Sequence, residues 1–549
     1  MAAHDTDVIV IGSGLSGLVA ACTALDRGRT VTLVEQEGPQ SIGGQAFWSF
    51  GGLFLVDSPE QRRLGIEDSL ELAWEDWEHT AGFDRDGDDG EDLWARRWAD
   101  AYLDFAHRDL RPWLRELGIR LFPVVGHAER GARTPGGHGN TVPRFHIVWG
   151  TGPGLVAPFT RRLRDAVRDG SATLAFRHRV TELLTEGDRV VGVAGERLAD
   201  DVTVRGEPSS REVMGEFSLR AESVVVATGG IGGELERVRE LWPASLGTAP
   251  REAVRGVPVH VDGSGLGLAG AAGARLVNGD RMWHYTEGIK NWDPVWPDHG
   301  IRILPGPSSL WLDHLGRRLP SPNYPGFDTL STLAHLRSVG AEHSWFVLTQ
   351  SIVEKEFTLS GSEQNPDLTG RSVPKLLQRV LPGAPAPVQA FLDHGEDFVV
   401  AHSLTELLDG MERLSGPIDR AGVVAAIEER DDAVADPAST DPQAVEIRRA
   451  REYLGDRLVR TAAPHRILDE RHWPLIAVRL RTLTRKTLGG IQTDLDSRAL
   501  GAAGEPVPGL FAVGEAAGFG GGGVHGYRAL EGTFLGGCLH SGLRAGRRA

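Results

Sequence analysis

The first strand, turn and helix predicted along the chain constrain its fold more than any other segment. Residues 7–36 read DVIVIGSGLSGLVAACTALDRGRTVTLVEQ, two apolar runs separated by the motif Gly12-x-Gly14-x-x-Gly17 and a helical stretch. This order predicts a β-α-β unit in which Gly12 makes the turn, Gly14 admits a pyrophosphate and Gly17 lets helix and strand pack closely. The helix N-terminus would bind phosphate, and Glu35 would accept hydrogen bonds from ribose hydroxyls. We therefore expect an α/β, Rossmann-like domain that binds a dinucleotide.

Four further segments indicate FAD rather than NAD. Residues 42–52 (IGGQAFWSFGG) offer two glycine pairs, 221–230 (AESVVVATGG) form an apolar strand ending in glycines, and 504–518 place a strand before Gly-Glu. Residues 532–537 (GTFLGG) begin a helix whose free N–H groups would face the flavin, where negative charge collects on reduction. The residues expected at the cofactor are Gly12, Ser13, Gly14, Ser16, Gly17, Glu35, Gln36, Gly43, Gly44, Gln45, Gly51, Gly52, Val180, Ala227, Thr228, Gly229, Gly514, Glu515, Gly532, Thr533, Phe534 and Leu535.

Charge and composition exclude several other classes of protein. The net charge of −16 disfavours binding to nucleic acid or to an anionic membrane surface. The two cysteines form no C-x-x-C pair, so neither a zinc site nor a disulfide framework is indicated, and no metal site is expected. No apolar run reaches the roughly 18 residues that a membrane span needs. The acidic start lacks the basic region of a signal peptide, which favours a cytoplasmic location.

Together these motifs resemble the fumarate reductase/succinate dehydrogenase flavoprotein superfamily, which also contains the 3-ketosteroid dehydrogenases. Within it the chain is most similar to the bacterial group called FAD-binding dehydrogenases, and the resemblance extends to residues 262–276 and 310–319. It implies that residues 1–280 and 481–549 together form the FAD-binding domain, around a central parallel sheet. Residues 281–480 would form an inserted α+β capping domain that closes over the substrate.

The resemblance also bears on how FAD is held. Some members attach it covalently through a histidine that lies six residues before the second glycine pair. Gln45 stands at that position here, so the resemblance implies noncovalent FAD.

Members of this superfamily move a hydride between the flavin and a carbon beside a carbonyl or carboxylate. Read as a ketosteroid dehydrogenase, Tyr527 and the Gly532 amide resemble the pair that polarises the substrate carbonyl, with one residue more than usual between them. Tyr285 or His284, in the segment WHYTEG, would move the proton. Lys486, beside a glycine pair, would contact the substrate.

Arg528 is the last candidate, and the sequence leaves two roles open for it. It would either touch the substrate or pair with Glu531 or with the cap. In a fumarate reductase motif the clamp arginine would fall on Ala529, one position later, and Lys486 replaces a dicarboxylate-binding histidine. The proton-delivering arginine would fall near Phe327. These departures disfavour fumarate reduction.

We therefore expect an FAD-dependent dehydrogenase that acts on CH–CH bonds next to a carbonyl, with a ketosteroid-like or polycyclic ketone as substrate. Two alternatives remain: a reductase of a small unsaturated acid, and an electron carrier or redox sensor without desaturase activity. The expected partners are a small-molecule substrate and an electron acceptor that the sequence does not identify. A homo-oligomer is left open.

Overall fold

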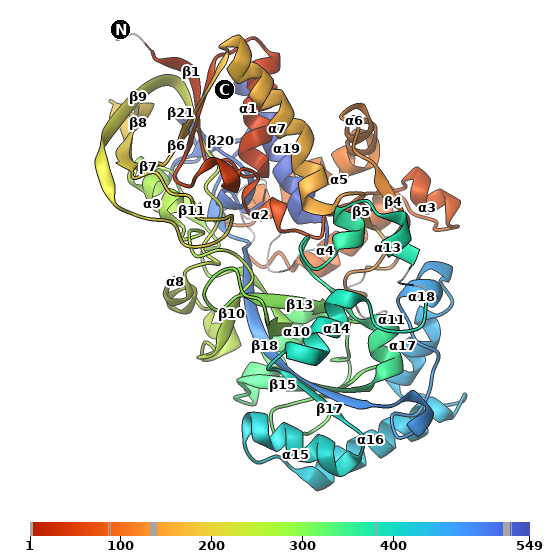
Figure 1. The fold of residues 1–549 in the computed structure, drawn as a ribbon. Coiled ribbons are helices and arrows are strands. Elements are labelled where there is room, and N and C mark those ends of the chain that lie inside the picture. The colour runs from red at the N-terminus through yellow and green to blue at the C-terminus, as the bar shows by residue number, and fades with distance from the viewer. Residues whose placement is uncertain are drawn as a thin grey trace.

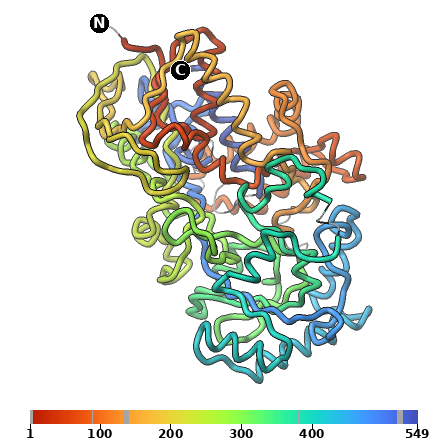
Figure 2. The backbone as a smooth tube through the Cα atoms, in the orientation of Figure 1, coloured from red at the N-terminus to blue at the C-terminus, as the bar shows by residue number. Residues whose placement is uncertain are grey.

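The computed structural model describes residues 4–549 except 86, 88, 132–139, 378, 380, 520–527 and 529. Its two large sheets lie one above the other in Figure 1, and both chain ends lie at the upper end of the molecule (Figure 2). Of the described helices, none is both long enough and apolar enough to cross a membrane.

The upper sheet grows from the predicted β-α-β unit. β1 (Thr6–Ile11) and β2 (Val31–Glu35) pair in parallel and are connected by α1 (Leu15–Asp26). The strand order is β20-β21-β9-β1-β2-β6, and β8 adds an antiparallel ribbon with β7 and β9. The remaining strands are β6 (Ala172–Phe176), β7 (His178–Glu186), β8 (Arg189–Leu198), β9 (Val213–Val226), β20 (Arg498–Leu500) and β21 (Pro506–Ala512). Because β21 pairs in parallel with β9, segments near both ends of the chain complete one sheet, and the predicted α/β class is confirmed.

Three helices, α1, α7 (Thr151–Asp169) and α19 (Thr533–Arg548), lie side by side against this sheet (Figure 1). Glycines set how closely α1 and α19 approach. A Cβ at Gly542 would lie 2.6 Å from the backbone oxygen of Ser16, and one at Gly546 would lie 2.4 Å from that of Ala20. The small residues of α19 therefore place its N-terminus next to the turn that follows β1.

Beside these helices lies a smaller layer. It contains α2 (Gly44–Phe47), α3 (Pro59–Arg63), α4 (Leu70–Ala81), α5 (Leu93–Arg108) and α6 (Leu110–Glu116), with a small sheet of β3 (Gly52–Phe54), β5 (Phe145–Val148) and β4 (Leu121–Gly126). Aromatic residues of α5 belong to the core, since Trp98 and Tyr102 are buried. Ser58 begins α3 with a capping box that involves Gln61.

The lower sheet has the order β14-β15-β18-β12-β13-β16, and β10 and β17 also pair with β18. Its strands are β10 (Ala253–Arg255), β12 (Met282–Lys290), β13 (Gly300–Leu304), β14 (Leu310–Leu312), β15 (His343–Thr349), β16 (Thr358–Leu359), β17 (Phe398–Ala401) and β18 (Leu475–Thr487). Around it lie α10 (Thr329–Ser338), α11 (Gln350–Glu356), α12 (Pro366–Thr369), α13 (Val373–Leu377), α14 (Ala386–His394), α15 (Leu404–Ser415), α16 (Arg420–Ala435), α17 (Pro442–Ala450) and α18 (Leu454–Val459). At the junction with the upper sheet are α8 (Leu235–Glu240), α9 (Ser264–Ala271), β11 (Leu276–Val277) and β19 (Gly490–Ile491). β18 runs from the middle of the lower sheet up to this junction (Figure 1).

Candidate cofactor and substrate site

A cavity lies at the junction of the two sheets. It encloses about 1650 Å³ of space that protein atoms do not fill, part of it open to solvent, and the turn after β1, the end of β9 and strands β12, β13 and β18 line it. Residues of both sheets therefore face one cavity, as expected where a cofactor and a substrate meet.

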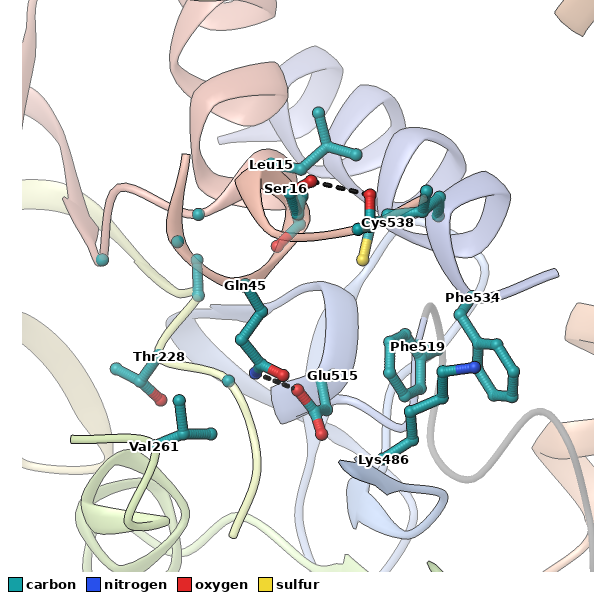
Figure 3. A pocket seen from close by; sticks show the side chains of 18 of the residues that line it. Leu15, Ser16, Gln45, Thr228, Val261, Lys486, Glu515, Phe519, Phe534 and Cys538 are labelled. Carbon is teal, nitrogen blue, oxygen red and sulfur yellow. Dashed lines mark hydrogen bonds between the residues drawn. The ribbon is translucent and has the colours of Figure 1, made fainter. Parts of the chain in front are cut away.

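Most of the residues predicted at the cofactor line this cavity. They are Gly12, Ser13, Gly14, Ser16, Glu35, Gln36, Gly44, Gln45, Gly51, Gly52, Val180, Ala227, Thr228, Gly229, Glu515, Gly532, Phe534 and Leu535. Figure 3 shows ten of the lining residues by name, among them Ser16, Gln45, Thr228, Glu515 and Phe534.

The structure places the other four predicted residues, Gly17, Gly43, Gly514 and Thr533, behind the lining. A Cβ at Gly17 would lie 2.3 Å from the backbone oxygen of Gly12, so this glycine serves helix packing. The Gly43 N–H donates to the backbone oxygen of Ser13. A Cβ at Gly514 would lie 2.3 Å from the Ser16 hydroxyl oxygen. These glycines shape the cavity from behind its wall.

The cavity wall at Gly14 fits a bound diphosphate. Gly14 has an ordinary extended backbone, φ −66° and ψ 172°, and a Cβ there would meet nothing closer than the Ala227 backbone oxygen at 4.0 Å. Neither the backbone conformation nor the protein's own packing therefore requires glycine, whereas a ligand lying against the backbone would. Gly14 also begins α1, whose first turn has no side-chain cap and no acidic residue, so its N–H groups are available to an anion.

Two further groups fit the rest of the cofactor. The buried Thr228 Oγ1 has no hydrogen-bond partner among the described residues, and Thr228 lines the cavity. The Glu35 carboxylate accepts from the Ser13 N–H at 2.8 Å, the Ser13 hydroxyl at 2.7 Å and the Glu37 N–H at 2.9 Å. A carboxylate has about four acceptor sites, so one remains for a ribose hydroxyl. The donor set therefore fits FAD.

Gln45 is held by Glu515, as Figure 3 shows. The Gln45 amide donates to one carboxylate oxygen of Glu515, and the Thr487 N–H donates to the other at 2.9 Å. Burial raises the pKa of Glu515, although these hydrogen bonds oppose the rise. An amide is not a nucleophile, so this position offers no attachment point for a flavin methyl group.

We accordingly expect all of the flavin to leave the protein on denaturation. After heating or acid precipitation, the absorbance at the visible flavin band should be found entirely in the supernatant. Colour that stays with a washed precipitate would contradict noncovalent binding.

Four polar side chains, here called the polar cluster, meet in the cavity: Tyr285 of β12, Arg302 of β13, Lys486 of β18 and Glu531 just before α19. The Tyr285 hydroxyl donates to Glu531 Oε1 at 2.8 Å, and Lys486 Nζ donates to the Tyr285 hydroxyl. Lys486 Nζ lies 3.4 Å from Glu531 Oε2, and Arg302 donates to Glu531 Oε1 at 2.9 Å. Lys486 Nζ also lies 3.6 Å from the centre of the Phe534 ring. Glu531 therefore holds three donors in a fixed arrangement.

Burial and neighbouring charges shift the pKa values of three members of the polar cluster. Burial, reinforced by the Glu531 carboxylate, raises the pKa of Tyr285 well above its usual value of 10. Burial lowers the pKa of Lys486 to about 7, with Arg485 and Arg302 adding to this effect and Glu531 opposing it. Burial alone would raise the pKa of Glu531, but Lys486 and Arg302 outweigh it and hold the pKa below its ordinary value. Lys486 is thus the member that changes protonation state near neutral pH.

Two further carboxylic acids, Glu129 and Glu287, lie beside the Arg302 guanidinium. Arg302 donates to Glu129 at 2.7 Å, and Glu287 lies 3.8 Å away. Burial raises the pKa of Glu129 and of Glu287.

The structure does not bring His284 into the cavity. Neighbouring residues on a strand point to opposite faces. Tyr285 faces the cavity, whereas His284 stacks on Trp242 with ring centres 4.9 Å apart. Burial lowers the pKa of His284 to about 3. A proton-transfer role for His284 is therefore not supported by its position.

Arg528 contacts the start of α10. Its guanidinium donates to the Ser331 hydroxyl at 3.3 Å and lies 3.6 Å from Asp328, both at the start of α10. This position favours the role in which Arg528 pairs with residues 281–480, the segment predicted to form the cap. Gly532 lines the cavity at the N-terminus of α19 with φ +95°, a backbone conformation that favours glycine. Tyr527 lies outside the described residues.

Arg302 is a site residue that the motifs did not indicate. It sits in the strand GIRIL, where the other residues are apolar or glycine, and its side chain is buried. An arginine inside a buried strand must find carboxylate partners. The lone arginine in an apolar strand was therefore a signal that could have indicated a buried polar site, but the sequence does not identify its carboxylate partners.

Comparison with known proteins agrees with the geometry. The family model described as FAD binding domain matches residues 7–535. A protein of Mycolicibacterium smegmatis named KsdD-like steroid dehydrogenase is 60% identical over 533 residues, which cover 97% of this chain and 96% of that protein. The structure of 3-ketosteroid delta1-dehydrogenase from Sterolibacterium denitrificans gives a TM-score of 0.68 at 17% identity, covering 99% of this chain and 98% of that one. A flavocytochrome c3 fumarate reductase gives 0.63 at 20% identity, covering 98% and 77%.

The predicted resemblance to this flavoprotein superfamily is confirmed. The chain belongs to the FAD-binding family that this model describes, and it is an FAD-dependent oxidoreductase.

Proposed function

We propose that the protein dehydrogenates a steroid-like ketone at the CH–CH bond next to its carbonyl. The observation that carries this proposal is the polar cluster of Tyr285, Lys486, Glu531 and Arg302 in a cavity whose lining also includes Phe50, Phe145 and Leu304. Apolar rings fit such walls, and a buried tyrosine–lysine pair fits the removal of a proton beside a carbonyl. The names of the relative and of the structural neighbour point to the same substrate class.

The residues that would hold FAD are those around Gly14, Glu35 and Thr228, with the N-terminus of α19 beside the ring. When bound, FAD supplies the acceptor for the hydride that leaves one carbon. From the neighbouring carbon Tyr285 takes the proton, and its own hydroxyl proton passes to Lys486. The two electrons of that C–H bond then form the new double bond.

The carbonyl oxygen needs a donor while charge develops on it. We propose that Tyr527 and the Gly532 amide supply this donor, supported by the place of Gly532 in the cavity wall at a helix N-terminus. Residues 281–480 would carry the substrate-facing part as a cap, while 1–280 and 481–549 hold the cofactor.

The test is an anaerobic titration of the purified yellow protein with saturated and unsaturated ketosteroids, and with fumarate and succinate as small acids. We expect the visible flavin band to bleach with a saturated 3-ketosteroid and not with succinate. If dithionite bleaches the band but no steroid does, the cofactor assignment survives and the steroid proposal fails.

A further inference from the structure

Arg485 differs from the other cations in the cavity wall. Arg179 donates to Glu196 at 3.0 Å, Arg302 to Glu129 at 2.7 Å, and Lys486 lies 3.4 Å from Glu531. Arg485 lines the same cavity, but no described residue forms a hydrogen bond or an ion pair with its guanidinium. Its positive charge is therefore the one along this described wall that no carboxylate within 4 Å balances.

The fold leaves space for the backbone and side-chain stem of Arg485. It lies on β18, one residue before Lys486, so the two side chains leave the strand in opposite directions. Its Cγ lies 3.3 Å from where a Cβ of Gly256 would be, and its backbone oxygen lies 2.8 Å from where a Cβ of Gly232 would be. These two glycines leave room for the arginine stem and strand. The guanidinium thus lies at the cavity without a hydrogen bond to the polar cluster, although its charge helps to lower the pKa of Lys486.

Glu363 is a carboxylic acid whose pKa the charge of Arg485 lowers, which makes it a candidate for an internal partner. Burial raises the pKa of Glu363 to about 7, and the charge of Arg485 only partly opposes this rise. The buried Glu363 Oε2 has no hydrogen-bond partner among the described residues, and the two side chains form no ion pair. At neutral pH Glu363 is therefore partly protonated and leaves Arg485 uncompensated.

A half-buried guanidinium without a partner is costly, and its planar set of donors matches a carboxylate in bidentate geometry. We propose that Arg485 binds an anionic oxygen group of the substrate, so that the substrate is a steroid-like ketone that also carries a carboxylate. This inference rests on the proposed function and narrows its substrate class. The other source of the same chemistry is a phosphate of the cofactor, and the experiment separates the two.

The experiment compares the wild type with Arg485→Gln, Arg485→Lys and Glu363→Gln. Three substrates are used: a 3-ketosteroid whose side chain ends in a carboxylate, its methyl ester, and neutral 4-androstene-3,17-dione. The readouts are the ratio of kcat/KM for acid over ester and the Kd of FAD from titration of the apoprotein. We expect Arg485→Gln to lower the acid-to-ester ratio by about 10–100-fold, with the Kd of FAD within about 2-fold of wild type. Arg485→Lys should restore part of the ratio, because it keeps the charge but not the bidentate geometry.

Three results would overturn the inference. A large rise in the Kd of FAD in Arg485→Gln would assign the guanidinium to a cofactor phosphate. Equal losses of kcat/KM for acid and ester would show that Arg485 does not bind the substrate carboxylate. If Glu363→Gln lowers the acid-to-ester ratio of kcat/KM as much as Arg485→Gln does, Arg485 and Glu363 act as a pair and Arg485 is not free to bind the substrate.

Failure of the proposed function can be told apart from failure of this inference. If the wild type turns over none of the three steroids, the dehydrogenase proposal fails. Binding is then read from perturbation of the flavin spectrum by the acid. A perturbation that Arg485→Gln abolishes still supports an anion site at Arg485, and the absence of any perturbation in the wild type overturns it.

Discussion

Replacing Tyr285 by phenylalanine should lower kcat for the ketosteroid identified by titration by about 10²–10⁴-fold, the range expected when a group that transfers a proton is lost. The substitution removes only the hydroxyl that donates to Glu531 at 2.8 Å and accepts from Lys486. The ring keeps its place below Arg302, whose guanidinium carbon lies 3.8 Å from the ring centre. Steady-state turnover with an artificial electron acceptor measures the effect.

A matched control is Tyr453→Phe. The Tyr453 hydroxyl donates to the backbone oxygen of Val125, away from the cavity lining, so this variant should keep wild-type turnover. Both variants should retain the full FAD content and a similar melting temperature. If Tyr285→Phe keeps more than about half of the wild-type kcat, another group moves the proton and the proposed step is wrong.

The second large effect concerns Lys486 and pH. Because burial lowers its pKa to about 7, Lys486 is an ammonium group below that pH and a neutral amine above it. Only the amine can accept the proton that Tyr285 gives up. For dehydrogenation, kcat/KM should therefore rise about tenfold per unit as pH increases toward 7 and level off above it. Lys486→Met should remove this inflection and lower the plateau by about 10²-fold.

The Lys486→Met variant should still fold, since Glu531 keeps Arg302 as a partner at 2.9 Å. Its control is Lys375→Met on α13, where the side chain is exposed and does not line the cavity, and which should keep the wild-type profile. An inflection near pH 7 that persists in Lys486→Met would assign it to another group, such as Glu129, whose pKa burial raises.

The cofactor half of the fold was predictable because its requirements are local. A phosphate on a helix N-terminus needs glycines within a few residues of each other, and the Gly12–Gly17 motif carries them between two strands. Strand β9 and the Gly-Glu segment after β21 were likewise readable as apolar runs that end in glycine. That both ends of the chain form one domain was implied by the resemblance, and the strand order β21-β9-β1 comes from the structure alone.

The substrate half was less readable because its contacts join residues far apart in the chain. Tyr285 and Glu531 are 246 positions apart, and Arg302 and Glu531 are 229 apart. No local pattern specifies such a pairing. The segment WHYTEG drew attention to both His284 and Tyr285, and only the direction of β12 separates them. Arg485 looked like one more arginine, and its unpaired state is visible only in three dimensions.

The close packing of α1 against α19 limits how early the protein can fold during its synthesis. α1 ends at Asp26 and α19 starts at Thr533, yet Gly542 and Gly546 bring the two helices into contact. A ribosome adding about 5–20 residues per second needs roughly 25–100 s to make the intervening chain. During that time the apolar face of α1 lacks its final neighbour. The part of the cavity wall formed by α19 can therefore be completed only after nearly the whole chain has been made. Until then the exposed apolar face of α1 is a surface that chaperones can bind.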